Sequence, residues 1–175
     1  MDYELIEKQV VYQGDRIRLE VHHLMAGATR YRKEVVVHPG AAVIVPVLPD
    51  GKILLIRNRR YALNQFLIEL PAGTLEKNED PMNCAGRELL EETGYLARRL
   101  KLLTSFFTSP GVFTEKIHAF VAYDLEKRQQ DLDLGEDIEL FPVTLGHSLE
   151  MIRSGEVQDA KTLAALMYYE RFVEH

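Results

Sequence analysis

The chain of 175 residues is 46% hydrophobic and 27% charged, which is enough for one domain with a substantial apolar core and a small extension. Its formal net charge of −6 gives no overall attraction toward a polyanion, so the clustered positive charge of a nucleic-acid-binding protein is not indicated. Its single cysteine, Cys84, excludes an internal disulfide framework, and no pair of His or Cys has the spacing of a zinc site.

The first residues carry no targeting signal. The chain begins MDYELIEKQ, which lacks the basic and then apolar pattern of a secretion signal. No apolar run approaches the roughly 18 to 20 residues that a membrane-spanning helix needs. We therefore expect a cytoplasmic protein.

Three alternating runs between Glu4 and His38 predict β-strands. The runs are ELIEKQVVYQ, RIRLEVHHL and TRYRKEVVVH, and turns at Gly14 and near Gly27 separate them. An antiparallel meander of this size is too thin to bury both of its faces by itself. We expect residues 1–38 to form an N-terminal β subdomain that packs on the main domain or on a second subunit.

Residues 39–175 are expected to form the main domain. It opens with the apolar runs AAVIVPVL and KILLIRN on either side of the turn PDG at 49–51, which predicts a hairpin of two central strands. A helix over roughly 81–93 follows. Asp80, placed before a proline, provides its N-cap, and Gly94 provides its end.

The remaining pattern alternates strands and helices. Strands are predicted at about 100–108, 116–123 and 137–143, and helices at 146–153 and 159–173. This order implies an α/β (α+β) sandwich in which helices cover both faces of a mixed sheet.

Three glutamates share one side of the predicted helix over 81–93. Glu88, Glu91 and Glu92 stand at positions i, i+3 and i+4, so they project from neighbouring positions. Such crowding of like charge destabilises a bare helix, and an all-oxygen ligand set suits a hard cation such as Mg²⁺ or Mn²⁺. The alternative is a solvated acidic face in which Arg87 pairs with Glu91.

The helix and its surroundings resemble a known family motif. They match the Nudix box of the Nudix hydrolases at every defined position: Gly73-x5-Glu79-x7-Arg87-Glu88-Leu89-x-Glu91-Glu92-x-Gly94-Tyr95. The resemblance implies a Nudix-type α/β/α sandwich. It also implies a loop-helix-loop whose carboxylates bind divalent ions that activate water and bridge a diphosphate.

The resemblance assigns roles to residues of the box. Glu88 and Glu92 would be the main metal ligands, and Glu91 would be a further ligand with a part in catalysis. The backbone carbonyl of Ala72 would also bind metal. Gly73 would let the chain turn tightly enough for that carbonyl to reach the metal.

Two further residues of the box remain to be assigned. Arg87, as a catalytic residue, would orient the glutamate cluster. Glu79 has two interpretations: it is a fourth carboxylate of the cluster, or it is a charge partner for the N-terminal end of the helix.

Residues outside the box resemble the ADP-ribose and nucleoside-diphosphate-sugar pyrophosphatase branch of this family. The stretches that carry the resemblance are KEVVVHPG at 33–40, ELPAG at 69–73 and SPG at 109–111. The resemblance implies that Pro110 and Gly111 contact the substrate, and that the N-terminal strands exchange between the subunits of a homodimer. Taken alone, Pro110 and Gly111 predict an ordinary turn.

Four basic residues bear on the substrate. Arg60 falls where this branch has an arginine that contacts the diphosphate, and a guanidinium suits that bidentate contact. Lys33 stands where the branch usually has arginine. It is a substrate-binding candidate that offers a point charge, and a solvated strand residue is the alternative. Arg59 replaces an aromatic residue of the relatives, and we interpret Arg57 and Arg59 as solvated charges.

The acidic loop at 131–137 resembles a loop that swings over the active site with a glutamate. Glu136 matches that glutamate best, as a metal ligand or as the catalytic base. Leu134 stands where some relatives carry the proposed base, so Asp133 competes with Glu136 for this role. An exposed acidic loop with no catalytic part is the alternative.

These features predict an Mg²⁺-dependent enzyme, in which Mn²⁺ can substitute. It would hydrolyse ADP-ribose or a related nucleoside diphosphate sugar to a nucleoside monophosphate and a sugar phosphate. GDP-mannose is the alternative substrate, because residues 149–156 and 159–162 also resemble hydrolases of that sugar nucleotide. The alternative of another class is a non-catalytic, nucleotide-binding regulatory Nudix module, which has less need of a complete carboxylate set.

Overall fold

The computed structural model describes residues 3–132, 135 and 137–173. Contacts divide the chain into two compact units. The N-terminal unit comprises Met1–Gly40 and Phe107–Lys116, and the main unit comprises Ala41–Phe106 and Ile117–His175. The sequence pattern gives no indication that segment 107–116 belongs with the N-terminal strands.

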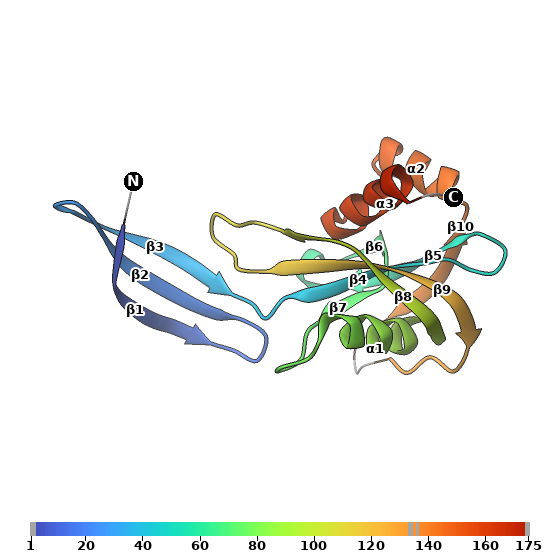
Figure 1. Cartoon of the computed structure of the whole chain (residues 1–175), viewed down its shortest axis with the longest axis horizontal. Helices are drawn as coiled ribbons and strands as arrows, with labels where there is room; N and C mark the ends of the chain where they lie inside the picture. Colours follow the sequence, from blue (N-terminus) through green and yellow to red (C-terminus); the bar gives the residue numbers. More distant parts are fainter. Residues whose placement is uncertain (1–2, 133–134, 136, 174–175) are drawn as a thin grey trace. The chain divides into compact units, whose positions relative to one another are not determined.

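The N-terminal unit contains an antiparallel sheet with the strand order β1-β2-β3, drawn in blue in Figure 1. Its strands are β1 (Glu4–Gln13), β2 (Arg18–Ala26) and β3 (Thr29–Val37), so the three predicted strands are confirmed. β1 is exposed along its whole length, whereas β2 buries Glu20 and Leu24. The meander by itself therefore leaves an edge strand uncovered.

Hydrogen bonds join segment 107–116 to the end of β3. The N–H of Val36 donates to the Val112 carbonyl at 2.8 Å, and the N–H of Thr114 donates to the Val36 carbonyl at 3.0 Å. The N–H of His38 donates to Thr114 Oγ1 at 2.9 Å. The predicted substrate-binding turn is thus attached to β3 within the N-terminal unit.

Within the described residues of the main unit, the strands form two sheets. One is mixed, with the order β7-β4-β9-β8, and the other is antiparallel, with the order β10-β5-β6. The strands are β4 (Ala41–Pro46), β5 (Ile53–Arg60), β6 (Gln65–Glu69), β7 (Ala72–Thr74), β8 (Tyr95–Phe107), β9 (Lys116–Lys127) and β10 (Ile138–Val143). The short elements β6, β7 and the 3₁₀ turn η1 (Tyr61–Leu63) are not predicted by the sequence pattern.

Helices cover both faces of the mixed sheet. α1 (Pro81–Thr93) lies on one side, whereas α3 (Ala160–Phe172), with α2 (Leu145–Ser154) beside it, lies on the other (Figure 1). The predicted α/β sandwich with a mixed sheet is therefore confirmed, as are its helices. No helix in the described part of the chain is long and apolar enough to cross a membrane.

β4 separates the apolar core under α1 from the core under α3. Successive side chains of a strand point to opposite faces. Ala42 and Ile44 accordingly pack with Leu89 of α1, whereas Val43 packs with Leu166 of α3. Because both of its faces are covered, β4 is buried throughout, as its unbroken apolar run predicts.

The hairpin predicted for β4 and β5 is wrong. Both strands form, but they belong to different sheets, and a single bridge between Val47 and Ile53 joins their ends. The reason is that β4 already pairs along both edges, antiparallel with β7 and parallel with β9. β5 in turn pairs along its own two edges with β10 and β6.

The C-terminal end of α1 is closed by the segment that leads into the acidic loop. Gly94 adopts the left-handed conformation, with φ 69°, and turns the chain directly into β8, which therefore starts earlier than predicted. The N–H of Asp131 donates to the Glu91 carbonyl at 3.0 Å, which satisfies one of the helix's last carbonyls. At the other end of the loop, the N–H of Arg59 donates to the Asp137 carbonyl at 3.3 Å.

Gly94→Ala should lower the free energy of unfolding more than Gly51→Ala does. Both glycines have left-handed φ angles, 69° and 81°, which cost an alanine about 1 kcal/mol. An added Cβ at Gly94 would also lie 2.9 Å from the backbone N of Gln130, so we expect a further loss of at least about 1 kcal/mol. Urea denaturation measures both losses, and equal losses would contradict the close-packing explanation.

Candidate active site

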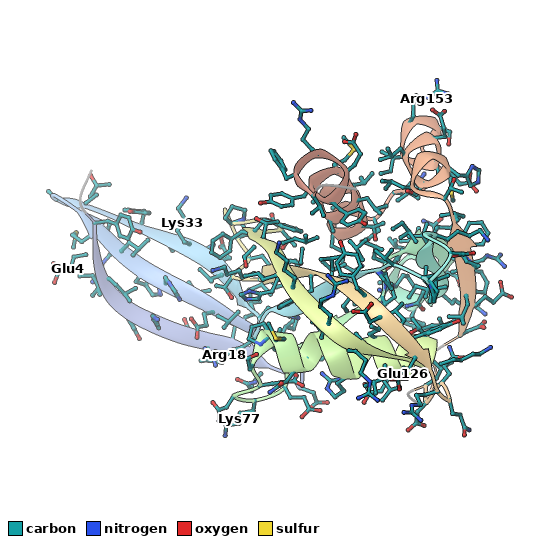
Figure 2. All side chains as sticks on the ribbon, turned by 45° about the vertical axis from the view of Figure 1, so that its right-hand side comes forward. Glu4, Arg18, Lys33, Lys77, Glu126 and Arg153 are labelled. Carbon is teal, nitrogen blue, oxygen red and sulfur yellow. The ribbon has the colours of Figure 1, made fainter. Side chains whose placement is uncertain are left out.

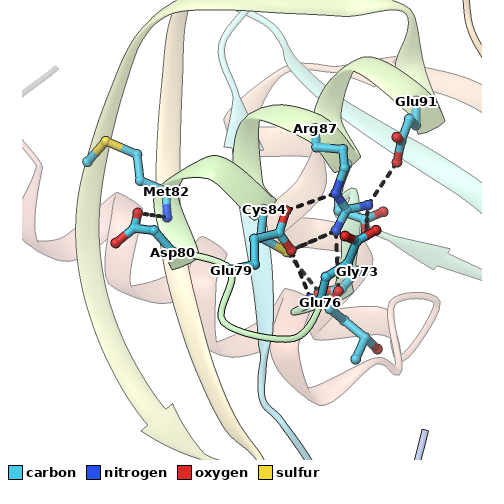
Figure 3. A network of polar contacts seen from close by, with 10 residues as sticks. Gly73, Glu76, Glu79, Asp80, Met82, Cys84, Arg87 and Glu91 are labelled. Carbon is cyan, nitrogen blue, oxygen red and sulfur yellow. Dashed lines mark hydrogen bonds and ion pairs between the residues drawn. The ribbon is translucent and has the colours of Figure 1, made fainter. Parts of the chain in front are cut away.

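The Nudix box folds as strand β7, a loop and helix α1 (Figure 3). The Asp80 carboxylate accepts the N–H of Met82 at 2.9 Å and caps the helix, and Pro81 occupies its first position. An N-cap carboxylate followed by proline is a strong helix start. The capping residues predicted from the sequence are therefore confirmed, and they set where α1 begins and ends.

Arg87 is the centre of the polar network in Figure 3. Its Nε and Nη2 donate to Glu79 at 2.9 and 3.0 Å. Its Nη1 donates to Glu88 at 2.7 Å and to Glu91 at 2.9 Å, and Nη2 also reaches the Thr74 carbonyl at 3.3 Å. One guanidinium thus holds three carboxylates, including the Glu91 partner expected at i+4.

Glu79 belongs to this network, while Asp80 caps the helix. Besides its bonds to Arg87, Glu79 Oε2 accepts the N–H of Glu76 at 2.9 Å, which closes the loop before α1. The hydrogen bond from Arg87 lowers the pKa of Glu79. Conversely, the bonds to Glu79 raise the pKa of Arg87, to which the charge of Glu88 also contributes.

Glu88 explains why residue 73 is glycine. A Cβ built on Gly73 would lie 1.9 Å from Cδ of Glu88, so the carboxyl group occupies the space of a side chain. The tight turn expected at Gly73 is wrong, because Gly73 lies within strand β7 and has no positive φ. Cys84 lies nearby and donates weakly to the Gly73 carbonyl at 3.6 Å. Burial raises the pKa of this thiol to about 12, so it stays neutral.

Glu92 is joined to Ala72, the residue whose carbonyl is a predicted metal ligand. Glu92 is 2% exposed, and its Oε2 accepts the N–H of Ala72 at 2.9 Å. Burying a carboxylate is costly unless it is hydrogen-bonded. This bond therefore fixes the last box glutamate against the first residue of β7.

The donors predicted to bind metal are all oxygens, from the Ala72 carbonyl and the carboxylates of Glu88, Glu91 and Glu92, and such a set fits a hard divalent cation. Among the residues that the structure describes, no three His, Cys, Asp or Glu side chains are grouped closely enough to hold a metal ion. Arg87 supplies the positive charge among the carboxylates instead. The individual metal ligands therefore stay a prediction.

Arg60 lies in a second charged group that the sequence analysis does not predict. Its Nε and Nη2 donate to Glu69 at 2.7 and 2.5 Å, and Lys161 of α3 donates to the same carboxylate at 2.6 Å. Burial raises the pKa of Glu69, but the hydrogen bonds and charges of Arg60 and Lys161 outweigh it, so the pKa is lowered. The one sequence signal is that Glu69 is the only charged residue between Phe66 and Glu76.

Electrostatics link Arg60 to the box. The hydrogen bond to Glu69 is the main cause that raises the pKa of Arg60, and the charges of Glu92 and Asp159 add to it. The backbone links them as well, because Glu69, which binds Arg60, stands three residues before Ala72, whose N–H binds Glu92.

Arg57 and Arg59 stand on the other face of β5 from Arg60, because successive strand residues alternate. Their guanidinium carbons lie 4.3 and 6.0 Å from the ring centre of Phe66, and Arg57 pairs with Glu139 at 3.1 Å. Both remain exposed, but they are partnered rather than simply solvated.

The remaining predicted residues lie in the N-terminal unit or outside the described residues. Lys33 is an exposed residue of β3 (Figure 2), and Pro110 and Gly111 are exposed in segment 107–116, so all three belong to the N-terminal unit. Glu136 and the competing Asp133 lie outside the described residues. The roles of these residues stay predictions.

Comparison with known proteins identifies the family. The family model of the NUDIX domain matches residues 37–166, which is most of the chain, and the protein therefore belongs to the Nudix family. It is a hydrolase of that family, as its relatives indicate. Nudix hydrolases generally need a divalent metal ion.

Several relatives align over most of the chain. The chain is 38% identical to an ADP-ribose pyrophosphatase of Bacillus subtilis (strain 168), over 97% of the chain and 94% of the relative. It is 36% identical to a methanol dehydrogenase activator of Bacillus methanolicus (94% and 91%) and 32% identical to a GDP-mannose pyrophosphatase of Shigella flexneri (86% and 87%). The solved structure of an ADP compounds hydrolase shares the fold, with a TM-score of 0.87 at 22% identity over 99% of this chain and 95% of that one.

Gly73→Ala should lower the hydrolase activity by about 100-fold or more, because the new Cβ displaces the Glu88 carboxylate, and misplacement by about 1 Å is enough for such a loss. The melting temperature should change little, since the displaced atoms end a flexible side chain. Gly86→Ala is the matched control on α1, where an added Cβ meets Leu100 at an ordinary 3.6 Å. Steady-state kinetics and thermal melting of both variants check this, and an active Gly73→Ala enzyme would refute it.

Proposed function

We propose that the chain is an Mg²⁺-dependent pyrophosphatase of ADP-ribose or a related nucleoside diphosphate sugar. It yields a nucleoside monophosphate and a sugar phosphate, and it acts in the cytoplasm. The observation that carries the proposal is the short segment 69–72, in which Glu69 binds Arg60 and the N–H of Ala72 binds the box carboxylate Glu92. A diphosphate bound to metal at the box would have a guanidinium within reach, and guanidinium is well suited to phosphate oxygens.

The proposed mechanism divides the work among the residues of the chain. Mg²⁺, for which Mn²⁺ can substitute, would be held by Glu88, Glu91, Glu92 and the Ala72 carbonyl, and would neutralise the diphosphate and activate water. Arg60 would bind the diphosphate. Arg87 orients the carboxylates through the hydrogen bonds described above.

The proton acceptor is proposed to come from the acidic loop. Glu136 would accept the proton from water or ligate metal, with Asp133 as the competing base. The support is that both ends of this loop are fixed on the main unit. Asp131 is bonded to the end of α1 that carries Glu91, and Asp137 is bonded to Arg59, which precedes Arg60.

GDP-mannose is the second candidate substrate. The GDP-mannose pyrophosphatase of Shigella flexneri favours it, as does the resemblance of the tail at 149–156 and 159–162. A non-catalytic regulatory module is the candidate of another class. The complete set of box carboxylates argues against it, because a module that only binds a nucleotide has less need of that set.

Purified protein with Mg²⁺ should cleave ADP-ribose to AMP and ribose 5-phosphate. The test is a panel of ADP-ribose, GDP-mannose, UDP-glucose, diadenosine polyphosphates and NADH, with products identified by chromatography. Glu92→Gln should lower kcat by about 100-fold or more, because it removes a charge that binds metal. Its stability should change little, since the glutamine oxygen can still accept the N–H of Ala72.

Glu126→Gln is the control for this test. Glu126 is an exposed glutamate of β9 that pairs with Arg98 (Figure 2), and its removal should leave kcat unchanged. Near-normal turnover of Glu92→Gln at saturating Mg²⁺ would reject the metal site. Cleavage of GDP-mannose alone would transfer the function to the second candidate.

The N-terminal unit supports the further proposal of a homodimer, in which its strands exchange between subunits. Val10, Val11 and Tyr12 are 53%, 55% and 56% exposed on β1. Apolar side chains on an uncovered edge strand favour association with another strand or surface. A second copy of the chain would cover them and could place Lys33, Pro110 and Gly111 against substrate.

Light scattering at micromolar concentration should give the mass of a dimer. Val10→Lys should raise the dissociation constant by about tenfold or more, because a buried apolar contact of about 1.4 kcal/mol is worth that factor. Glu7→Lys adds a lysine to the same strand without removing apolar surface, so it should have a smaller effect. A fully active monomer of the unchanged chain would overturn the proposal.

A further inference from the structure

Glu69 is a carboxylate buried in the protein interior, where an unpaired charge is energetically unfavourable. It ends β6 and is 0% exposed. An isolated buried carboxylate costs several kcal/mol, and paired cations and hydrogen bonds offset that cost only when their geometry is good. An apolar residue would serve the packing of β6 without this requirement. The presence of Glu69 therefore calls for an explanation beyond stability.

The contact between Glu69 and Arg60 fixes the plane of the guanidinium. Nε and Nη2 each donate to one oxygen of the same carboxylate, at 2.7 and 2.5 Å. Such a two-point contact sets the orientation of the group as well as its position. Arg60 Nη1 has no acceptor among the described residues, and the side chain is 38% exposed. The outer edge of the guanidinium therefore remains able to receive an anion.

Lys161 fixes the carboxylate from the other side. Its Nζ donates to Glu69 Oε2 at 2.6 Å and lies 2.9 Å from Asp159 Oδ1. Asp159 is the N-cap of α3 and accepts the N–H of Thr162 at 3.0 Å. Lys161 therefore ties the first turn of α3 to the end of β6.

The same turn of α3 also holds the chain that leads into the box. Thr162 Oγ1 accepts the N–H of Leu70 at 2.8 Å. Two residues after Leu70 comes Ala72, whose N–H binds Glu92. Glu69, which holds Arg60, and Ala72, which begins β7, thus lie in one short segment, 69–72, that α3 anchors.

We infer that Glu69 and Lys161 are positioning residues for Arg60. Lys161 fixes the buried Glu69 carboxylate, and Glu69 holds the Arg60 guanidinium in the orientation that receives the diphosphate. The inference rests on the proposed function, because it takes Arg60 as the residue that contacts the diphosphate. α3 accordingly has a part in substrate binding through its first turn.

Glu69→Gln tests the inference by removing the charge and keeping the shape. KM for ADP-ribose should rise about tenfold while kcat stays within about threefold, because Arg60 already holds the diphosphate in the bound substrate. In the Arg60→Ala background, Glu69→Gln should change KM by less than about twofold, since residues that act through one another are not additive. A merely structural role would lower the melting temperature without this dependence on Arg60.

Lys161→Met gives a second, milder test if Glu69→Gln does not fold. Lys161→Met should raise KM about threefold, again only when Arg60 is present. Lys161→Arg keeps the positive charge and should give a KM close to that of the wild type. Glu139→Gln is the matched control. It removes the carboxylate partner of Arg57 on the other face of β5 and should leave KM unchanged.

The outcomes separate the inference from the proposed function. If the wild-type enzyme is active but the KM effect of Glu69→Gln or Lys161→Met adds to that of Arg60→Ala, the inference alone is overturned. Additivity of Lys161→Met in particular would mean that Lys161 contacts the substrate itself. A wild-type chain that cleaves no nucleoside diphosphate sugar would overturn the proposed function, and the inference with it.

Discussion

The candidate site depends on a guanidinium placed among like charges. Carboxylates on neighbouring turns of one helix, with Cβ atoms about 5 to 6 Å apart, destabilise it by about 0.2 to 0.5 kcal/mol per pair. Arg87 offsets this by donating to Glu79, Glu88 and Glu91 and by reaching the Thr74 carbonyl of β7. The hydrogen bonds of Arg87 that offset this repulsion therefore also fix α1 to β7, the strand that precedes it in the box. A metal ion would add a further cation to a set already held in place.

The chain uses the same physical solution at Glu69, where Arg60 and Lys161 surround one buried carboxylate. The two charged groups differ in how they are assembled. The Arg87 group is built within one strand, one loop and one helix, whereas the Glu69 group needs β5, β6 and α3 to be packed together. The Glu69 group therefore forms only when the C-terminal part of the chain has folded onto the sheets.

Local signals explain what could be predicted from the sequence. Asp80 and Gly94 set the ends of α1, and helical spacing alone indicates the Arg87–Glu91 pair. Contacts between distant segments could not be predicted in this way. Lys161 meets Glu69 across 92 positions of sequence, and the turn PDG gave no sign that β4 pairs with β7 and β9 rather than with β5. The need for glycine at position 73 likewise comes from a side chain of another element.

The division of the interior by β4 has a consequence for how this sequence can change over evolution. One core lies against α1 and the other against α3, and the residues of β4 contribute alternately to each. A substitution on one side can be compensated by repacking on that side, so each core can drift as a separate group of coupled positions. Drift under α1 is constrained by the box glutamates on that helix. Under α3, the first turn is constrained by its polar contacts to segment 69–72, whereas Ala165, Leu166 and Tyr169 need only fill the core with a similar volume.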